Sequence, residues 1–422
     1  MVIFAIILFT IIFAILSWKR MDWALILIAF GLPTYLLRFK IGFLPMTVLE
    51  VMILVIFIIW IIKWLVDKKK IKEIYLSKYK WLILLFLIAA TIGVIVSPDK
   101  IAALGIWKAY FIEPILLLIV LINTFKEKKD YKKLFYAFGA SAILISIVAI
   151  YQKFTGAWIP NEFWRAEETR RVTSVYGFPN AIGLFLAPIV IWNLGELVLK
   201  WKENVWLQRI FYAVVIILSS LAIFWAKSEG AIVAMLVVSA IIFLKNKKTR
   251  WFAVGIIAIG IILSLALPAA GNILTDKLLL RDYSGEIRRE MWAETWDMLT
   301  ERPLEGAGLS GYQERVAAFH EKEHIEIYLY PHNIFLNFWT EIGLLGLVVW
   351  WLIIIKIFKN YFRISNFEFR ISYFIYLMVI LVILIHGLVD VPYFKNDLAV
   401  FWWMLVGMII SAKIKVQNAK QQ

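Results

Sequence analysis

Apolar runs long enough to cross a lipid bilayer recur along nearly the whole chain, and they limit the possible folds more than any other feature. A membrane-spanning helix needs about 20 mostly apolar residues. The backbone of such a segment must satisfy its own hydrogen bonds, so it is a helix or part of a closed barrel. The 422 residues are 62% hydrophobic, and the runs have helical length. We therefore predict an all-α, polytopic membrane helix bundle.

Thirteen segments have the length and character of membrane helices, and twelve is the alternative count because the first two are short. The predicted helices cover residues 2–17, 21–37, 45–63, 81–96, 105–123, 134–153, 180–199, 210–226, 230–244, 251–268, 333–355, 371–388 and 397–412. Positive charges follow the first run, at Lys19 and Arg20, rather than precede it. We therefore interpret that run as a retained helix and not as a signal peptide.

Basic residues concentrate in loops on one side of the predicted bundle. The four most basic loops, 67–80, 126–133, 245–250 and 356–370, fall on the same side of the helix count. Short cytoplasmic loops carry an excess of Lys and Arg, so we place these loops and the C-terminus in the cytoplasm. The net charge of +15 then reflects topology, with anionic membrane lipid as a secondary partner and no nucleic acid partner.

One long polar loop lies on the opposite, extracytoplasmic side, and its Trp-containing segment 285–301 has a helical pattern typical of a membrane interface. Ordered loops of this length are commonly functional. The prediction divides the chain into four parts, which are transmembrane helices at 1–268, the extracytoplasmic loop with short amphipathic helices at 269–332, C-terminal transmembrane helices at 333–412 and a tail at 413–422.

A histidine and an asparagine, His332 and Asn333, stand at the start of a predicted membrane helix. The positive end of a helix dipole disfavours an imidazolium ion, so a histidine there tends to be neutral and able to accept a proton. The functional interpretation of His332 is a general base. The alternative is an interfacial histidine that caps the helix.

Arginines gather on the same predicted face, and Arg171 and Arg288 are the strongest candidates for ligand binding. Guanidinium groups form paired hydrogen bonds with phosphate oxygens, so this clustering suits a phosphorylated ligand. A solvated loop with salt bridges is the alternative, and the acidic neighbours of Arg165 favour it there.

Glu341 lies nine residues beyond His332, which places the two on roughly opposite faces of one helix and about 13 Å apart along its axis. They are therefore not a catalytic pair on a shared face. We predict a structural role for Glu341 in helix packing, because an intramembrane carboxylate faces the bundle interior. Gly343 and Gly346 would let another helix approach closely.

Several kinds of chemistry are excluded or disfavoured. The chain has no cysteine, so disulfides, thiolate nucleophiles and Cys-bound metals are excluded. His320 and His324 have helical i,i+4 spacing, but no further clear metal ligand accompanies them. We predict neither a metal nor a cofactor.

Four stretches together resemble a known family. They are RRVTSVYGFPNAIGLFLAP (170–188), WAKSEGAIVAM (225–235), RREMWAETWDMLTERPLEGAGLSGY (288–312) and PHNIFLNFWTEIGLLG (331–346). In their order, their separation and the long outward loop before the His-Asn helix, the chain resembles the O-antigen ligase and polymerase superfamily of bacterial membrane glycosyltransferases.

Members of that superfamily move a glycan from a polyprenyl-diphosphate carrier to an acceptor outside the cytoplasmic membrane, without a metal. The resemblance implies the same donor here, with a glycan, lipid or protein as acceptor, and both ligase and polymerase chemistry fit the pattern. It implies His332 as the base that activates the acceptor hydroxyl. It also implies that Arg171 and Arg288 hold the diphosphate. We add Arg289, Lys227, Asn180 and Asn333 as candidate substrate-binding residues.

One position departs from the family pattern. The chain has Ser228-Glu229-Gly230 where the family often has Ser-Arg-Gly. A carboxylate there would repel a diphosphate. Lys227 is adjacent and could supply the charge, although helix geometry would direct it elsewhere.

A membrane transporter for an anionic solute is the alternative function, since outward arginines also suit a selectivity funnel. A transporter usually carries polar residues at mid-membrane depth in several helices. The buried charges predicted here are few and are Glu50, Lys108, Glu113 and Glu341. A non-catalytic scaffold would leave the histidine and arginines without a role, so an enzyme is favoured.

Overall fold

Helices dominate the computed structural model, which describes residues 2–42, 44–66, 79–125, 128–266, 275–277, 279–322 and 324–418. Within these ranges, seven helices are long and apolar enough to cross a membrane, and five further apolar helices are shorter. The all-α membrane bundle predicted from the sequence is confirmed. Most of the basic segment 67–80 lies outside the described residues.

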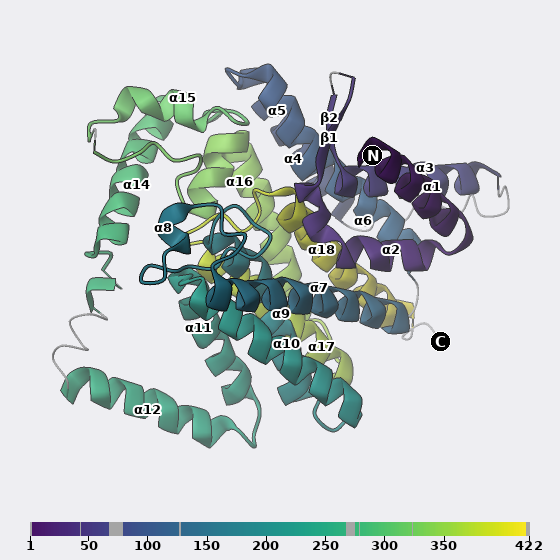
Figure 1. The fold of residues 1–422 in the computed structure, drawn as a ribbon. Helices are drawn as coiled ribbons and strands as arrows, with labels where there is room; N and C mark the ends of the chain where they lie inside the picture. The colour runs from purple at the N-terminus through teal and green to yellow at the C-terminus, as the bar shows by residue number, and fades with distance from the viewer. Residues whose placement is uncertain are drawn as a thin grey trace.

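Each of the thirteen predicted segments overlaps a helix of the structure (Figure 1). The bundle helices are α1 (Val2–Lys19), α2 (Met21–Phe30), α3 (Val48–Val66), α4 (Lys80–Val96), α5 (Lys100–Ile106), the π-helix η4 (Trp107–Ile112), α6 (Glu113–Thr124), α7 (Lys128–Thr155), α9 (Asn180–Leu199), α10 (Trp206–Trp225), α11 (Glu229–Lys245), α12 (Arg250–Ala266), α16 (Ile334–Tyr361), α17 (Phe367–His386) and α18 (Asn396–Asn418). The remaining elements are η1 (Leu32–Leu36), β1 (Arg38–Ile41), β2 (Leu44–Thr47), α8 (Glu162–Arg165), α14 (Tyr283–Glu301), α15 (Tyr312–Val316) and η5 (Ala317–Phe319).

The second predicted helix is much shorter than the sequence pattern indicated. The helix α2 ends at Phe30, and the 3-10 helix η1 follows, with a proline in its first turn. A short antiparallel hairpin of β1 and β2 follows. Its second strand covers the first residues assigned to the next helix, so α3 begins at Val48 and not at the predicted residue 45. The hairpin is possible because Gly42, with a φ of +60°, takes the left-handed conformation that its turn requires.

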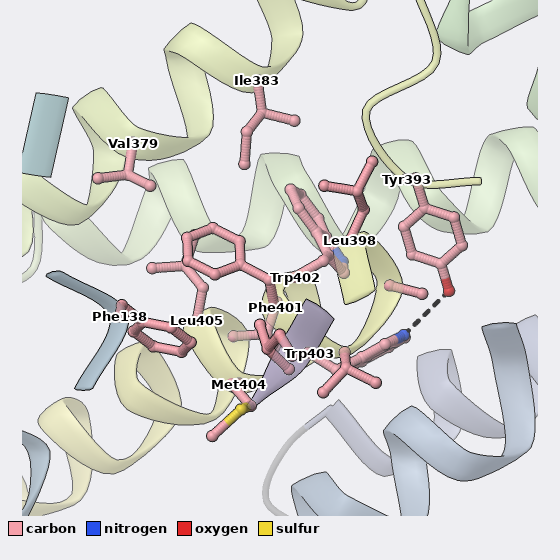
Figure 2. Packing of buried hydrophobic residues seen from close by; sticks show 14 of the residues in the cluster. Phe138, Val379, Ile383, Tyr393, Leu398, Phe401, Trp402, Trp403, Met404 and Leu405 are labelled. Carbon is pink, nitrogen blue, oxygen red and sulfur yellow. Dashed lines mark hydrogen bonds between the residues drawn. The ribbon is translucent and has the colours of Figure 1, made fainter. Parts of the chain in front are cut away.

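The C-terminal helix α18 runs through the interior of the bundle. Every residue from 396 to 411 is buried. Figure 2 shows Phe401, Trp402 and Trp403 of this helix surrounded by apolar side chains of its neighbours. The Trp403 Nε1 atom donates a hydrogen bond to the Tyr393 hydroxyl over 3.1 Å. Because Tyr393 precedes α18, the core also fixes the loop that enters this helix.

The helices α14 and α15 of the long loop lie beside α16 rather than within the main bundle (Figure 1). A separate small core joins Met298 and Leu299 of α14 to Tyr312 and Val316 of α15, with Trp339 of α16 packed against it. The long loop is therefore an ordered layer over α16 in its described residues.

Candidate active site

The loop between α17 and α18, residues 387–395, contacts all of the sequence stretches that carry candidate functional residues. We call it the α17–α18 loop. Its backbone carbonyl groups accept hydrogen bonds at three successive residues, from Ile334 N to Gly387 O, from Asn333 Nδ2 to Leu388 O and from Arg288 Nε to Val389 O. The next residue is Asp390, which is buried. The loop therefore holds the His-Asn motif and the long loop 269–332 next to the Asp390 carboxylate.

His332 and Asp390 form the central pair of the site. The His332 Nδ1 atom lies 3.5 Å from Asp390 Oδ1. That distance exceeds a usual N–H···O hydrogen bond, so the contact is electrostatic rather than a well-formed hydrogen bond. His332 also has a φ of +45°, a left-handed conformation that is uncommon for residues other than glycine and that concentrates at functional sites. Tyr328 packs edge-on against its ring, with centroids 5.5 Å apart.

Asp390 is held in its ionised form. Burial alone raises the pKa of Asp390, but His332, His386 and the backbone N–H of Val391 together outweigh burial and lower that pKa to about 2. A carboxylate beside Nδ1 favours the imidazole tautomer that carries its proton on Nδ1. The Nε2 atom of His332 is then the nitrogen that can accept a proton.

Asn333 is the N-cap of α16, so His332 is the residue just before the helix. The Asn333 Oδ1 atom accepts hydrogen bonds from Phe335 N and Leu336 N at 3.0 and 3.2 Å. Because Asn333 Nδ2 also donates to Leu388 O, one side chain both ends the helix and attaches it to the α17–α18 loop. Its described contacts are structural ones.

Arg288 approaches the same loop from α14. Its Nε atom donates to Val389 O over 3.2 Å, and its Nη1 atom to Ser284 O over 3.3 Å. One turn further along α14, Trp292 Nε1 donates to Pro331 O over 2.8 Å. Arg288 and Trp292 therefore attach α14 to the residues that directly precede Asp390 and His332. Arg289 is exposed, and its positive charge lies close enough to Lys322 to offset slightly the rise in the pKa of that lysine that Glu290 causes.

A second cluster forms around Arg171. Its Nη2 atom donates to Asn180 Oδ1 over 3.0 Å, and its Nε atom donates to Ala226 O over 2.9 Å. The carbonyl of Lys227 accepts a further contact from Nη2 over 3.3 Å. The structure thus brings together three predicted binding residues, Arg171, Asn180 and Lys227, where α9 begins and α10 ends. The Lys227 side chain is exposed.

Glu229, the departure from the family pattern, forms an ion pair with Lys277. The Glu229 carboxylate is exposed, with 61% of its side-chain surface accessible. The next residue, Gly230, packs tightly against the α17–α18 region, since a Cβ there would lie 2.6 Å from Val389 Cγ2 and 3.0 Å from His386 Cδ2. In the described structure, Gly230 therefore allows close packing, and Lys277 offsets the charge of Glu229.

Glu341 is buried away from His332 and has a backbone partner. Its Oε2 atom accepts a hydrogen bond from Ser310 N over 2.9 Å. Directly after it, α16 is broken at Ile342 and Gly343, where Gly343 has a φ of +70°. The Leu304 backbone, rather than another helix, approaches Gly343, and a Cβ at Gly346 would meet Ile342 of its own helix. Close helix approach occurs instead through Gly93 of α4, where a Cβ would lie 2.6 Å from Glu341 O.

No group of three or more potential metal ligands occurs among the described residues. His320 Nδ1 instead lies 3.0 Å from Glu294 Oε1 of α14, and His324 is exposed. Burial raises the pKa of Glu294, and His320 opposes that shift.

Asp390 is a residue of this site to which the sequence analysis assigned no role, although its carboxylate lies directly beside His332. It is far from the His-Asn motif along the chain, and helical periodicity relates only near neighbours. The available signal was an aspartate at the end of a membrane helix, four residues after His386.

Together the fold and these contacts define a multi-pass membrane protein with His332, Arg171 and Asp390 close to the ends of its helices. Residues 214–351 match the family model described as O-Antigen ligase (Wzy_C), which confirms the resemblance seen in the sequence and supports a membrane glycan ligase or polymerase of the bacterial inner membrane. The search of curated proteins finds no match. The matched segment includes His332, Arg288 and Glu341, whereas Arg171 and Asp390 lie outside it.

Proposed function

We propose that this protein transfers a glycan from a polyprenyl-diphosphate carrier to an acceptor hydroxyl on the outer face of the cytoplasmic membrane. The observation that carries the proposal is the pairing of His332 with an ionised Asp390 on a loop that also binds Arg288. A base, its orienting carboxylate and a fixed cation are the groups that such a transfer requires.

His332 acts as the general base in this scheme. The acceptor O–H loses its proton to Nε2 while its oxygen attacks the anomeric carbon of the donor. Asp390 holds the ring with its proton on Nδ1 and stabilises the imidazolium that forms, as the carboxylate does in a hydrolase triad. The bond between the anomeric carbon and the phosphate oxygen breaks, and polyprenyl diphosphate leaves.

Arg288 and Arg171 stabilise the diphosphate as its negative charge grows. Each uses some of its N–H groups to fix itself to backbone carbonyls, and a guanidinium has five such donors in all. Cations that are already fixed in place need little rearrangement during the reaction. The long loop, whose helix α14 carries Arg288, is expected to cover the site and limit hydrolysis of the donor.

The test is transfer by the purified protein in detergent, with a polyprenyl-diphosphate glycan, a set of candidate acceptors and EDTA. The wild-type protein is compared with His332→Asn, which keeps a side chain that tolerates the left-handed backbone. Metal-independent transfer that is lost in a folded His332→Asn protein would support the proposal. Equal transfer by the two proteins would remove His332 from the mechanism, and solute uptake into liposomes without transfer would favour a transporter.

A further inference from the structure

Lys395 is a cation that the proposed mechanism does not use, although it lies on the α17–α18 loop. It is partly buried and directly precedes α18. The Nζ atom lies 3.9 Å from the centre of the Phe178 ring and 5.4 Å from that of Tyr176. These aromatic residues lie in the chain between Arg171 and Asn180. Lys395 therefore joins the loop that carries Asp390 to the segment between Arg171 and Asn180.

The hydrogen-bonding capacity of this ammonium group is unused. Among the described residues, Lys395 Nζ has no acceptor within hydrogen-bond distance and no carboxylate within 4.0 Å. An ammonium has three N–H donors, and cation–π contacts hold its position without occupying all of them. The buried Lys200, by contrast, has a carboxylate partner, since its Nζ lies 2.6 Å from Glu196 Oε1. A partly buried ammonium that makes no direct ion pair can bind an anionic ligand.

We propose that the Lys395 ammonium binds a phosphate oxygen of the diphosphate in the lipid-linked donor, as a third cation beside Arg171 and Arg288. This inference rests on the proposed function, since it assigns a further donor-binding residue to the same site. Phe178, which is 41% exposed, forms an apolar platform under the ammonium. Its aromatic face keeps the charge in place while the N–H groups remain free for the ligand.

The charge of Lys395 depends on pH within an accessible range. Burial lowers the pKa of Lys395 to about 8, and Asp397 and Asp390 oppose that shift. The groups around it are Asp390 of the same loop, Asp397 of α18 and Tyr176 before α9. Asp390 has a pKa of about 2, and the pKa of Tyr176 is raised well above 10 because the phenol is buried. Neither changes its charge between pH 7 and pH 9.5.

The experiment measures binding of two probes, polyprenyl diphosphate without a glycan and the uncharged polyprenol, to the purified full-length protein. Lys395→Met is expected to weaken diphosphate binding about tenfold, the size of one charge-assisted hydrogen bond, and to leave polyprenol binding unchanged. Lys153→Met, near the C-terminal end of α7, is the matched control and should bind both probes as the wild type does.

A pH series keeps the test decisive if Lys395→Met fails to fold. Wild-type binding of polyprenyl diphosphate should weaken from pH 7 to pH 9.5, whereas Lys395→Arg should bind with little pH dependence because a guanidinium stays charged. A pH series that is identical for wild type and Lys395→Arg overturns the role of Lys395. So does a Lys395→Met protein that binds the diphosphate normally, or that loses both probes equally.

The same measurements separate failure of this inference from failure of the proposed function. A wild-type protein that binds polyprenyl diphosphate no better than polyprenol contradicts the proposed function as well. Selective diphosphate binding that does not respond to any Lys395 substitution contradicts only the inference about Lys395.

Discussion

Two buried carboxylates near the N-terminal half of α16 have very different partners. Asp390 lies beside the titratable ring of His332, and Arg288 donates to the carbonyl of the preceding residue, Val389. Glu341 accepts a backbone N–H from Ser310 beside a break in the helix. The difference teaches that a buried carboxylate is not by itself a functional signal. Its partner distinguishes the carboxylate that we propose to orient a base, Asp390, from the carboxylate that fixes a chain segment, Glu341.

The segment 303–311 shows what Glu341 organises. Its backbone enters the break in α16, where Ala307 N and Gly308 N donate to Thr340 O and Leu344 N donates to Leu304 O. Gly306 and Gly308 have positive φ values, and a Cβ at either would collide with neighbouring backbone. This region is closely packed around its glycines, whereas the α17–α18 loop carries the Lys395 ammonium, whose N–H groups have no partner among the described residues.

Among the changes near Asp390 or Glu341, replacement of His332 is expected to have the largest effect. His332→Asn should lower the transfer rate by roughly a thousandfold, since general base catalysis contributes about 10²- to 10⁴-fold. The rate is measured with saturating donor, and folding by thermal unfolding. His324→Asn, an exposed histidine of the same long loop, should transfer normally. A His332 variant with more than a tenth of wild-type activity would contradict the assignment.

Gly343→Ala tests the close packing around Glu341 and the break in α16. The new Cβ would lie 2.3 Å from Leu304 O at a φ of +70°, so the free energy of unfolding should fall by about 3 kcal/mol from backbone strain and collision. Chemical unfolding in detergent measures the change. Gly255→Ala is the control, because nothing lies within 4 Å of that position in α12. Equal stability of the two variants would show that the break in α16 accommodates a side chain at residue 343.

Asp390→Asn should lower kcat by about 10- to 100-fold with little change in the donor KM, because the arginines remain in place. The matched change, Glu341→Gln, keeps an oxygen for Ser310 N and should leave kcat unchanged. If both variants lose kcat equally, the functional distinction between the two carboxylates is wrong.

The same Asp390 variant has a pH signature. The pKa of Asp390 is lower in the folded protein, about 2, than its ordinary value of 3.8. The ionised group therefore stabilises the fold above pH 4, and that contribution is lost as the pH falls from about 4 to 2. Asp390→Asn should remove this part of the acid sensitivity in thermal unfolding curves, and curves that stay parallel to wild type would contradict it.

The smallest effect is expected at the ion pair between Glu229 and Lys277. Both side chains are exposed, and exposed ion pairs contribute about 1 kcal/mol or less. Lys277→Met should leave the melting temperature nearly unchanged. It should nevertheless raise the donor KM slightly, because Glu229 then opposes the diphosphate without a counter-ion. An unchanged KM would show that Glu229 is too far from the ligand to matter.

The sequence by itself determined the membrane helices, because each depends on a local run of apolar residues that must bury its backbone bonds within one segment. It also identified His332, Asn333 and Arg288 as candidates through short local motifs. It did not predict the hairpin at 38–47 or the break at Gly343, since both depend on turn geometry and on contacts with distant backbone.

Only the tertiary structure brought Asp390 to His332 and Lys395 to Phe178. These residues lie far apart in the sequence, and no helical period relates them. The buried helix α18 fixes the loop before it through the hydrogen bond from Trp403 to Tyr393. The positions of Asp390 and Lys395 therefore follow from packing of the bundle interior, which is a property of the whole chain and not of any motif.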